Sequence, residues 1–102
     1  MKSLLISRNR DMVIGLRLAG MKGVWAVSRE NILEHFEKAR QNPDIGIIVL
    51  TEDTFAEIRE NVFEHKRKDT TPLVVTIPER GGLKDKDFIM RYVKDSVGIK
   101  VD

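Results

Sequence analysis

A chain of 102 residues is long enough for one domain with a core of its own. It contains no cysteine, which excludes disulfide bonds and thiolate metal sites. Its 18 basic and 16 acidic side chains leave a net charge of +2, which argues against a nucleic-acid-binding protein, since basic residues usually dominate there. No apolar run reaches the roughly 20 residues that are needed to cross a bilayer, and the apolar stretch near the first residue is too short for the apolar region of a signal peptide. We therefore expect any link to a membrane to pass through a partner.

Four short apolar runs alternate with helix-like segments, which is the spacing of strand–helix units in a parallel sheet. The runs cover residues 4–6, 24–27, 45–50 and 73–77. The first and third are unbroken, as expected of central strands that are covered on both faces. The second contains a tryptophan between smaller residues and the fourth has a proline at each end, so we place these two at the edges. Right-handed crossovers then give the strand order 2-1-3-4.

This order predicts an α/β fold: a small, doubly wound, Rossmann- or flavodoxin-like parallel four-stranded sheet with helices on both faces and a C-terminal helix. A small antiparallel α+β fold is less favoured, because no two runs are joined by a tight turn. We expect a single domain over residues 1–102. It would comprise a sheet core (1–77), a flexible loop with two adjacent glycines (78–86), and a C-terminal helix and tail (87–102).

Caps and apolar spacing predict the helices. We expect them over about residues 11–19, 28–41 and 85–97, with another that begins after Thr51 as its cap. Gly20 suits the position after the first helix, and Ser28 is a good N-cap for the second. The residues expected to face the sheet are Val13, Leu16, Leu18 and Ala19, then Ile32, Leu33, Phe36 and Ala39, then Phe55, Ile58 and Val62. The last helix has an apolar side of Phe88, Ile89, Tyr92, Val93 and Val97.

The strand ends carry almost no catalytic chemistry. Enzymes of this fold class keep their active sites at the carboxyl ends of the strands, where this chain offers no phosphate loop, metal cluster or nucleophile–base pair. Glu52 and Asp53 follow the third strand, where a receiver-like domain keeps acidic residues for magnesium. Arg8 and Arg10 after the first strand would repel that cation. We therefore interpret Glu52 and Asp53 as charges in the first turn of a helix, and expect no catalytic, cofactor-binding or metal-binding residues.

The two histidines, His35 and His65, lie on different predicted helices about thirty residues apart. Each is flanked by charged residues, so we predict side chains on helix surfaces rather than a pair of metal ligands. The basic residues 66–68 fit the end of a helix, where cations interact favourably with the macrodipole.

Three segments of the chain resemble parts of one known family. Residues 11–21, DMVIGLRLAGM, are similar to the opening D-x-V-x-G-F-R-L-A-G-V of the F subunit of the V/A-type ATPases and ATP synthases. Residues 44–52 resemble its third strand and the start of the next helix, and residues 72–78 resemble its P-x-V-x-x-I-P strand. The chain departs from the family pattern at Ser7-Arg8, where Gly-Asp is common, and at Leu16, where phenylalanine is usual.

The resemblance implies a non-catalytic subunit of a central rotor stalk, which helps to couple ATP hydrolysis or synthesis to proton or sodium transport. Its partners would be the long coiled-coil D subunit and other subunits of the soluble sector, with nucleotide bound by other chains and no nucleic acid involved. The location implied is cytoplasmic and peripheral to the membrane. The alternative is a receiver-like regulatory or ligand-binding domain that lacks phosphorylation chemistry.

Residues that contact the partner are expected in two places. The first is the last helix, where Phe88 and Tyr92 lie one turn apart with Arg91 beside them, a combination of residue types enriched at interfaces. The glycines before this helix would let it shift without unfolding the sheet. The second is Arg17 in the first helix, within the segment that most resembles the family.

Overall fold

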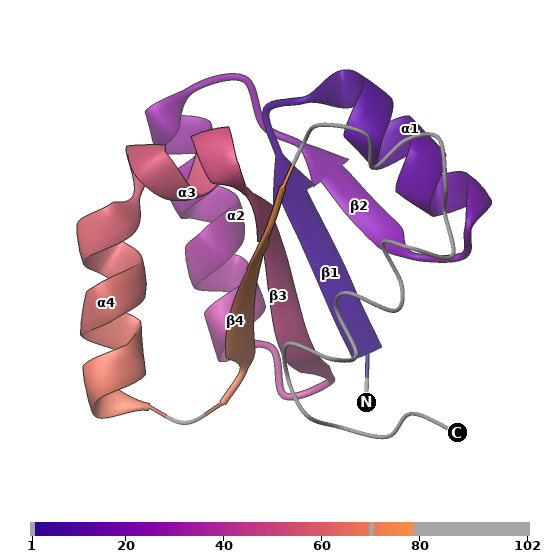
Figure 1. Cartoon of the computed structure of the whole chain (residues 1–102). Helices are drawn as coiled ribbons and strands as arrows, with labels where there is room; N and C mark the ends of the chain where they lie inside the picture. Colours follow the sequence, from indigo (N-terminus) through magenta and orange to yellow (C-terminus); the bar gives the residue numbers. More distant parts are fainter. Residues whose placement is uncertain (1, 70, 79–102) are drawn as a thin grey trace.

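The computed structural model describes residues 2–69 and 71–78. In this part of the chain one parallel sheet has helices packed on both faces (Figure 1). The elements, in chain order, are β1 (Lys2–Ser7), α1 (Arg10–Leu18), β2 (Lys22–Trp25), α2 (Arg29–Gln41), β3 (Ile45–Thr51), α3 (Glu52–Glu57), α4 (Arg59–Lys68) and β4 (Leu73–Ile77).

The sheet has the predicted strand order, β2-β1-β3-β4, and every neighbouring pair is parallel. β3 is a central strand, and all of its residues except Ile45 are buried. In register, Val49 lies between Leu5 of β1 and Val75 of β4. The unbroken apolar run of β3 is thus explained by coverage on both faces, and the predicted α/β fold is confirmed.

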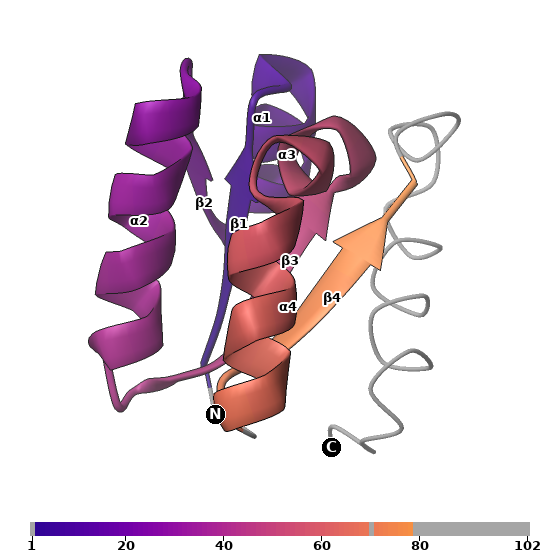
Figure 2. The ribbon, with the colours of Figure 1, turned by 90° about the vertical axis from the view of Figure 1, so that its left-hand side faces the viewer.

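The sheet separates two apolar clusters. In Figure 2, α2 and α4 lie in front of the sheet and α1 lies behind it. The α1 side of the sheet holds Leu5, Met12, Val13, Leu16, Met21, Ile47, Val49, Val75 and Ile77. The cluster under the other helices holds Ile6, Ala26, Ile32, Phe36, Ala39, Ile48, Leu50, Ile58, Val62 and Val74. Alternate residues of each central strand therefore serve opposite faces.

Helix α1 is capped at both ends by its own sequence. At the start, the side chain of Asn9 accepts a hydrogen bond from the amide of Met12. At the end, the amide of Gly20 donates to the carbonyl of Arg17, and the amide of Met21 donates to the carbonyl of Leu16. This is a Schellman motif, and it needs the positive φ of 95° that Gly20 adopts. The prediction that Gly20 terminates this helix is confirmed.

One part of the predicted inward face of α1 was wrong. Leu18 is 72% exposed, whereas Met12, which the prediction omitted, is completely buried. Met12, Val13 and Leu16 share the face toward the sheet, and Leu18 lies roughly 200° around the helix from Leu16 because each residue advances about 100°. The outer face of α1 therefore carries an exposed leucine.

The second strand lies earlier in the chain than the prediction. It covers Lys22–Trp25, whereas Ala26 and Val27 belong to the loop that follows. Gly23 permits this placement, since a Cβ atom there would lie only 3.2 Å from the side chain of Val13. Lysine and glycine are poor strand formers, so nothing in the sequence indicated that β2 begins at Lys22. The close packing of α1 on β2 became visible in the structure.

The helical segment after β3 is also more complex than the single helix expected. It is divided at Ile58, whose φ of −127° and ψ of 28° end α3 and begin α4. Ile58 and Val62 are buried as predicted, and Phe55 is partly buried. The predicted loop over 78–86, apart from Pro78, and the predicted C-terminal helix and tail lie outside the described residues.

Candidate functional site

Buried hydroxyl groups occupy the carboxyl end of the sheet, where an enzyme of this fold class would keep its active site. Ser7 ends β1, Thr51 ends β3 and Thr54 lies in α3, and none of the three has exposed surface. The Oγ of Ser7 lies 2.8 Å from Oγ1 of Thr51, which lies 2.9 Å from Oγ1 of Thr54. The amides of Asn9 and Arg8 donate to Ser7 and Thr54, each over 2.9 Å. These hydroxyls connect the β1–α1 loop to the start of α3.

The protons of this cluster can be assigned from its geometry. The hydroxyl of Thr51 donates to Oδ1 of Asp53 over 2.8 Å. A hydroxyl has one proton, so Ser7 must be the donor in its bond to Thr51. Oδ1 of Asp53 also accepts from the amide of Thr54 over 2.7 Å. Because Ser7 and Thr51 have no exposed surface, neither hydroxyl can be reached by a substrate in this conformation.

Glu52 and Asp53 lie in the first turn of α3, as predicted. There a negative charge is favoured by the helix macrodipole, and the contacts of Asp53 with Thr51 and Thr54 give it a structural role. Thr51 precedes the helix at the predicted position, but its side chain makes no cap bond to a backbone amide. Within residues 2–69 and 71–78, no group of three or more metal-ligating side chains comes together.

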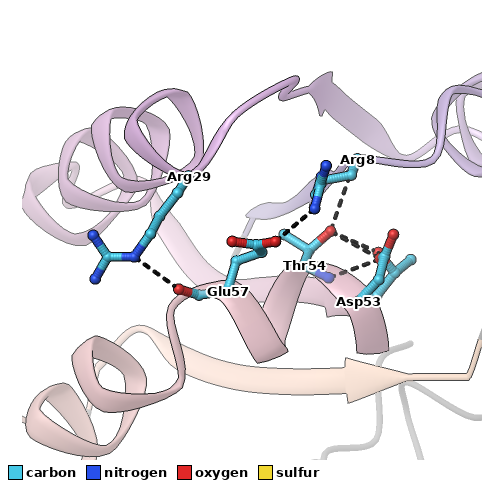
Figure 3. Close-up of polar contacts among 6 residues, drawn as sticks. Arg8, Arg29, Asp53, Thr54 and Glu57 are labelled. Atoms are coloured by element: carbon cyan, nitrogen blue, oxygen red, sulfur yellow. Dashed lines mark hydrogen bonds and ion pairs between the residues drawn. The ribbon is translucent and has the colours of Figure 1, made fainter.

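A second set of polar contacts links the loop after β1, the start of α2 and the end of α3. Figure 3 shows Arg8 paired with Glu57 and Arg29 bonded to the backbone of Glu57. The Arg8–Glu57 ion pair measures 2.6 Å, and the Nε of Arg29 donates to the Glu57 carbonyl over 3.1 Å. Both ionic side chains are about one-third to two-fifths exposed, so the pair stabilises the fold by at most about 1 kcal/mol. Its main effect is to hold the loop after β1 against the end of α3.

Beside this network lies an open hollow of about 400 Å³. Its lining mixes two arginines, two glutamates and neutral residues: Arg29, Ala56, Glu57, Arg59, Glu60 and Asn61. Ligand sites are usually lined mainly by apolar and aromatic side chains around a few polar groups. This hollow lacks that character, so we do not assign it a ligand.

Trp25 is an exposed aromatic side chain at this end of the molecule. The residue is 49% exposed, its indole N–H donates to the carbonyl of Arg8 over 3.1 Å, and the guanidinium carbon of Arg10 lies 5.7 Å from the ring centre. The hydrogen bond and the cation–π contact hold the ring in one orientation. An exposed aromatic ring that is already immobilised is a feature of protein-binding surfaces, because little entropy is lost when a partner covers it.

The prediction for His65 was wrong. Its side chain is only 2% exposed, with Nε2 lying 2.8 Å from the carbonyl oxygen of Pro72 and the ring edge-on to Phe36 at 6.0 Å between centroids. Since a carbonyl only accepts, Nε2 carries the proton in this bond. The spacing of Ile58, Val62 and His65, four and then three residues apart, places His65 on the buried face and is the signal that could have found it. His65 thus joins α4 to the start of β4, whereas His35 is partly buried on α2.

Of the four predicted partner-binding residues, one lies in the described part of the chain. Arg17 is exposed in the last turn of α1, where it can be reached by a partner. Phe88, Arg91 and Tyr92 lie outside the described residues. Contacts were not predicted for three exposed residues of α1 and β2, namely Ile14, Leu18 and Trp25.

Comparison with known proteins identifies the family. The family model described as "ATP synthase (F/14-kDa) subunit" matches residues 4–93. This chain belongs to that family. It is 32% identical over 94 residues to the F subunit of the A-type ATP synthase of Methanococcus maripaludis strain C7, an alignment that covers 89% of this chain and 90% of the relative.

More distant relatives carry the same description. The F subunit of the A-type ATP synthase of Methanococcoides burtonii is 28% identical over 96 residues, covering 94% of each chain. That of Thermoplasma acidophilum is 28% identical over 92 residues, covering 90% of this chain and 88% of the relative. The resemblance deduced from residues 11–21, 44–52 and 72–78 is therefore confirmed at the level of the family. No helix within residues 2–69 and 71–78 is long and apolar enough to cross a membrane.

Proposed function

We propose that this chain is a non-catalytic component of the central rotor stalk of an A/V-type ATPase or ATP synthase. It would bind a shaft like the coiled-coil D subunit and help to couple ATP hydrolysis or synthesis to proton or sodium transport. The observation that carries the proposal is the family match over residues 4–93. In this role the chain acts on the cytoplasmic side, is held at the membrane by the complex, and binds neither nucleotide nor nucleic acid.

The carboxyl end of the sheet supports a mechanical role. Its hydroxyls and charged side chains are bonded to one another, as described for Ser7, Thr51 and Asp53 and for Arg8 and Glu57. A protein that turns with a shaft must resist deformation, because any local yielding reduces the torque that reaches the shaft. Cross-links from the loop after β1 and from the start of α2 to α3 serve that requirement.

Reconstitution tests the proposal directly. The purified chain is mixed with the coiled-coil subunit and the catalytic subunits from the same source, and assembly is followed by gel filtration. We expect a stable complex with the coiled-coil subunit, and we expect loss of coupled ion transport when the chain is omitted. A chain that enters no complex with these subunits would contradict the proposed function.

The isolated chain is expected to have no ATPase activity and to take up no phosphate from a small phosphodonor. The physical reason is that Arg8 replaces the acidic residue needed after β1, and that Oδ1 of Asp53 accepts hydrogen bonds from Thr51 and Thr54. Phosphate release and magnesium titration by NMR check this expectation. A magnesium-dependent shift confined to Asn9, Glu52 and Asp53 would instead favour the receiver-like alternative.

We further propose that Phe88, Arg91 and Tyr92, together with Arg17, contact the shaft. Replacing both Phe88 and Tyr92 by alanine is expected to weaken binding to the coiled-coil subunit by about tenfold or more, because aromatic anchors dominate interface energies. Isothermal titration calorimetry measures the change. Phe63→Ala, which removes the aromatic ring of a residue on α4 that is 51% exposed, serves as the control. Unchanged affinity in the double variant would remove these residues from the proposed interface.

A further inference from the structure

The outer face of α1 carries an exposed row of side chains. Arg10, Ile14, Arg17 and Leu18 lie at positions i, i+4, i+7 and i+8, so they share the face opposite the core. Ile14 is 44% and Leu18 is 72% exposed. A helix that only covers a sheet needs one apolar face, which Met12, Val13 and Leu16 already supply. The row on the outer face has the spacing with which helices pack against one another.

Trp25 extends this row beyond the start of α1. The guanidinium of Arg10 lies over its ring, so the first residue of the helix and the last residue of β2 form one continuous surface. We call Arg10, Ile14, Arg17, Leu18 and Trp25 the α1 ridge. Tryptophan and arginine are the residues most enriched among energetically dominant interface contacts.

Several basic side chains on the other helices are neutralised by a glutamate. On α2 and α4, Lys38, Arg40, Arg67 and Lys68 each pair with a glutamate of the same helix, whereas Arg59 and Lys66 form no ion pair among the residues that the structure describes. Within the described part of the chain, Arg10, Arg17 and the neighbouring Lys22 form no such ion pair. The nearby acidic residue is Asp11. Within the described residues, the ridge therefore has two arginines beside its apolar positions Ile14 and Leu18, and this positive charge complements carboxylates.

We propose that the α1 ridge is a docking surface for a partner α-helix that has an apolar row flanked by acidic side chains. Leu18 and Ile14 pack into the apolar row, Trp25 closes one end, and Arg10 and Arg17 meet the carboxylates. Because the stated partner is a helix of the rotor shaft, the inference rests on the proposed function and adds to it the face that is used.

Two substitutions at Leu18 test both the apolar packing and the charge complementarity proposed for the α1 ridge. Leu18→Glu removes the apolar contact and adds a charge of the same sign as the partner, whereas Leu18→Lys removes the same contact and adds an attractive charge. We expect Leu18→Glu to weaken binding to the purified coiled-coil subunit by about tenfold or more, since burial of one leucine has that effect. Leu18→Lys should bind more tightly than Leu18→Glu, and the gap between them should shrink as salt is raised.

The matched control is Phe63→Glu, which makes a comparable charge change at an exposed apolar residue of α4, the helix that lies on the opposite side of the sheet from α1 in Figure 2. It should leave binding unchanged, and circular dichroism should show all three variants folded, because each site is at least half exposed. A third variant, Trp25→Phe, keeps a ring but removes the indole donor, and it should weaken binding by a smaller factor than Leu18→Glu.

The outcomes separate the two proposals. If the unaltered chain does not bind the coiled-coil subunit, the proposed function fails. If it binds, and Leu18→Glu and Trp25→Phe bind equally well, the ridge is not the docking surface and the proposed function stands. If Leu18→Lys is weaker than Leu18→Glu, the partner is not acidic and the stated chemistry is wrong. If sedimentation shows that the unaltered chain dimerises and Leu18→Glu abolishes the dimer, the occupant is a second copy, which overturns the proposal.

Discussion

Replacement of Val49 by aspartate is expected to unfold the domain. Val49 has no exposed surface, lies in the central strand β3 and faces the α1 side of the core. Leu5 and Val75 flank it in register, so among the described residues a carboxylate there meets apolar side chains. Burying an unpaired polar or charged group costs several kcal/mol, a large part of the roughly 5–15 kcal/mol by which a domain is stable.

Thermal unfolding followed by circular dichroism checks this expectation. Leu73→Asp is the matched control, because Leu73 also lies in the sheet but at the start of β4 with 36% of its surface exposed. We expect the control to fold with a modest loss of stability. A melting temperature for Val49→Asp equal to that of the unaltered chain would contradict the central position of β3.

His65→Ala is expected to destabilise the fold by about 2–4 kcal/mol, because it leaves a cavity and removes the partner of a buried carbonyl. The side chain is buried among α2, α4 and the start of β4, where it bonds to Pro72 and packs edge-on against Phe36. Denaturant unfolding measures the loss. His65→Gln, whose amide can still donate to the Pro72 carbonyl, should lose less than His65→Ala.

The other histidine supplies the control. His35 lies on α2 and is only partly buried, so His35→Ala should change the free energy of unfolding by about 1 kcal/mol or less. Equal losses at the two positions would mean that the Pro72 hydrogen bond and the packing on Phe36 contribute little to stability.

The sheet could be predicted from the sequence because a strand that is buried on both faces has an unbroken run of apolar residues. The unbroken run in β3 and the prolines around β4 indicate a central and an edge strand, and the structure agrees. The position of β2 was harder to predict, because its register depends on Gly23 packing against the side chain of Val13. The sequence alone does not show that these two residues are neighbours. Local composition favoured the more apolar residues that follow, which lie in a loop.

The candidate surfaces were less predictable for a related reason. Arg17 was predicted as a partner contact, and the structure shows only that it is exposed. The ridge also needs Trp25, which lies near Arg10 because β2 pairs with β1. The exposure of Leu18 follows from helical geometry. It could have been predicted from the sequence if Met12 had been assigned to the buried face of the helix. His65 was misassigned because its charged neighbours dominated the pattern, although its spacing from Val62 pointed inward.

The position of Trp25 gives the chain an intrinsic optical reporter. It is the single tryptophan among 102 residues. Fluorescence excited at the long-wavelength edge of the ultraviolet absorption band therefore comes from this one side chain, which lies beside Arg10 at the start of α1. Trp25 is 49% exposed in the free chain, and indole emission moves to shorter wavelength when water is replaced by protein atoms. Contact at the ridge can therefore be followed in the unlabelled chain, at concentrations low enough for tight binding to be measured.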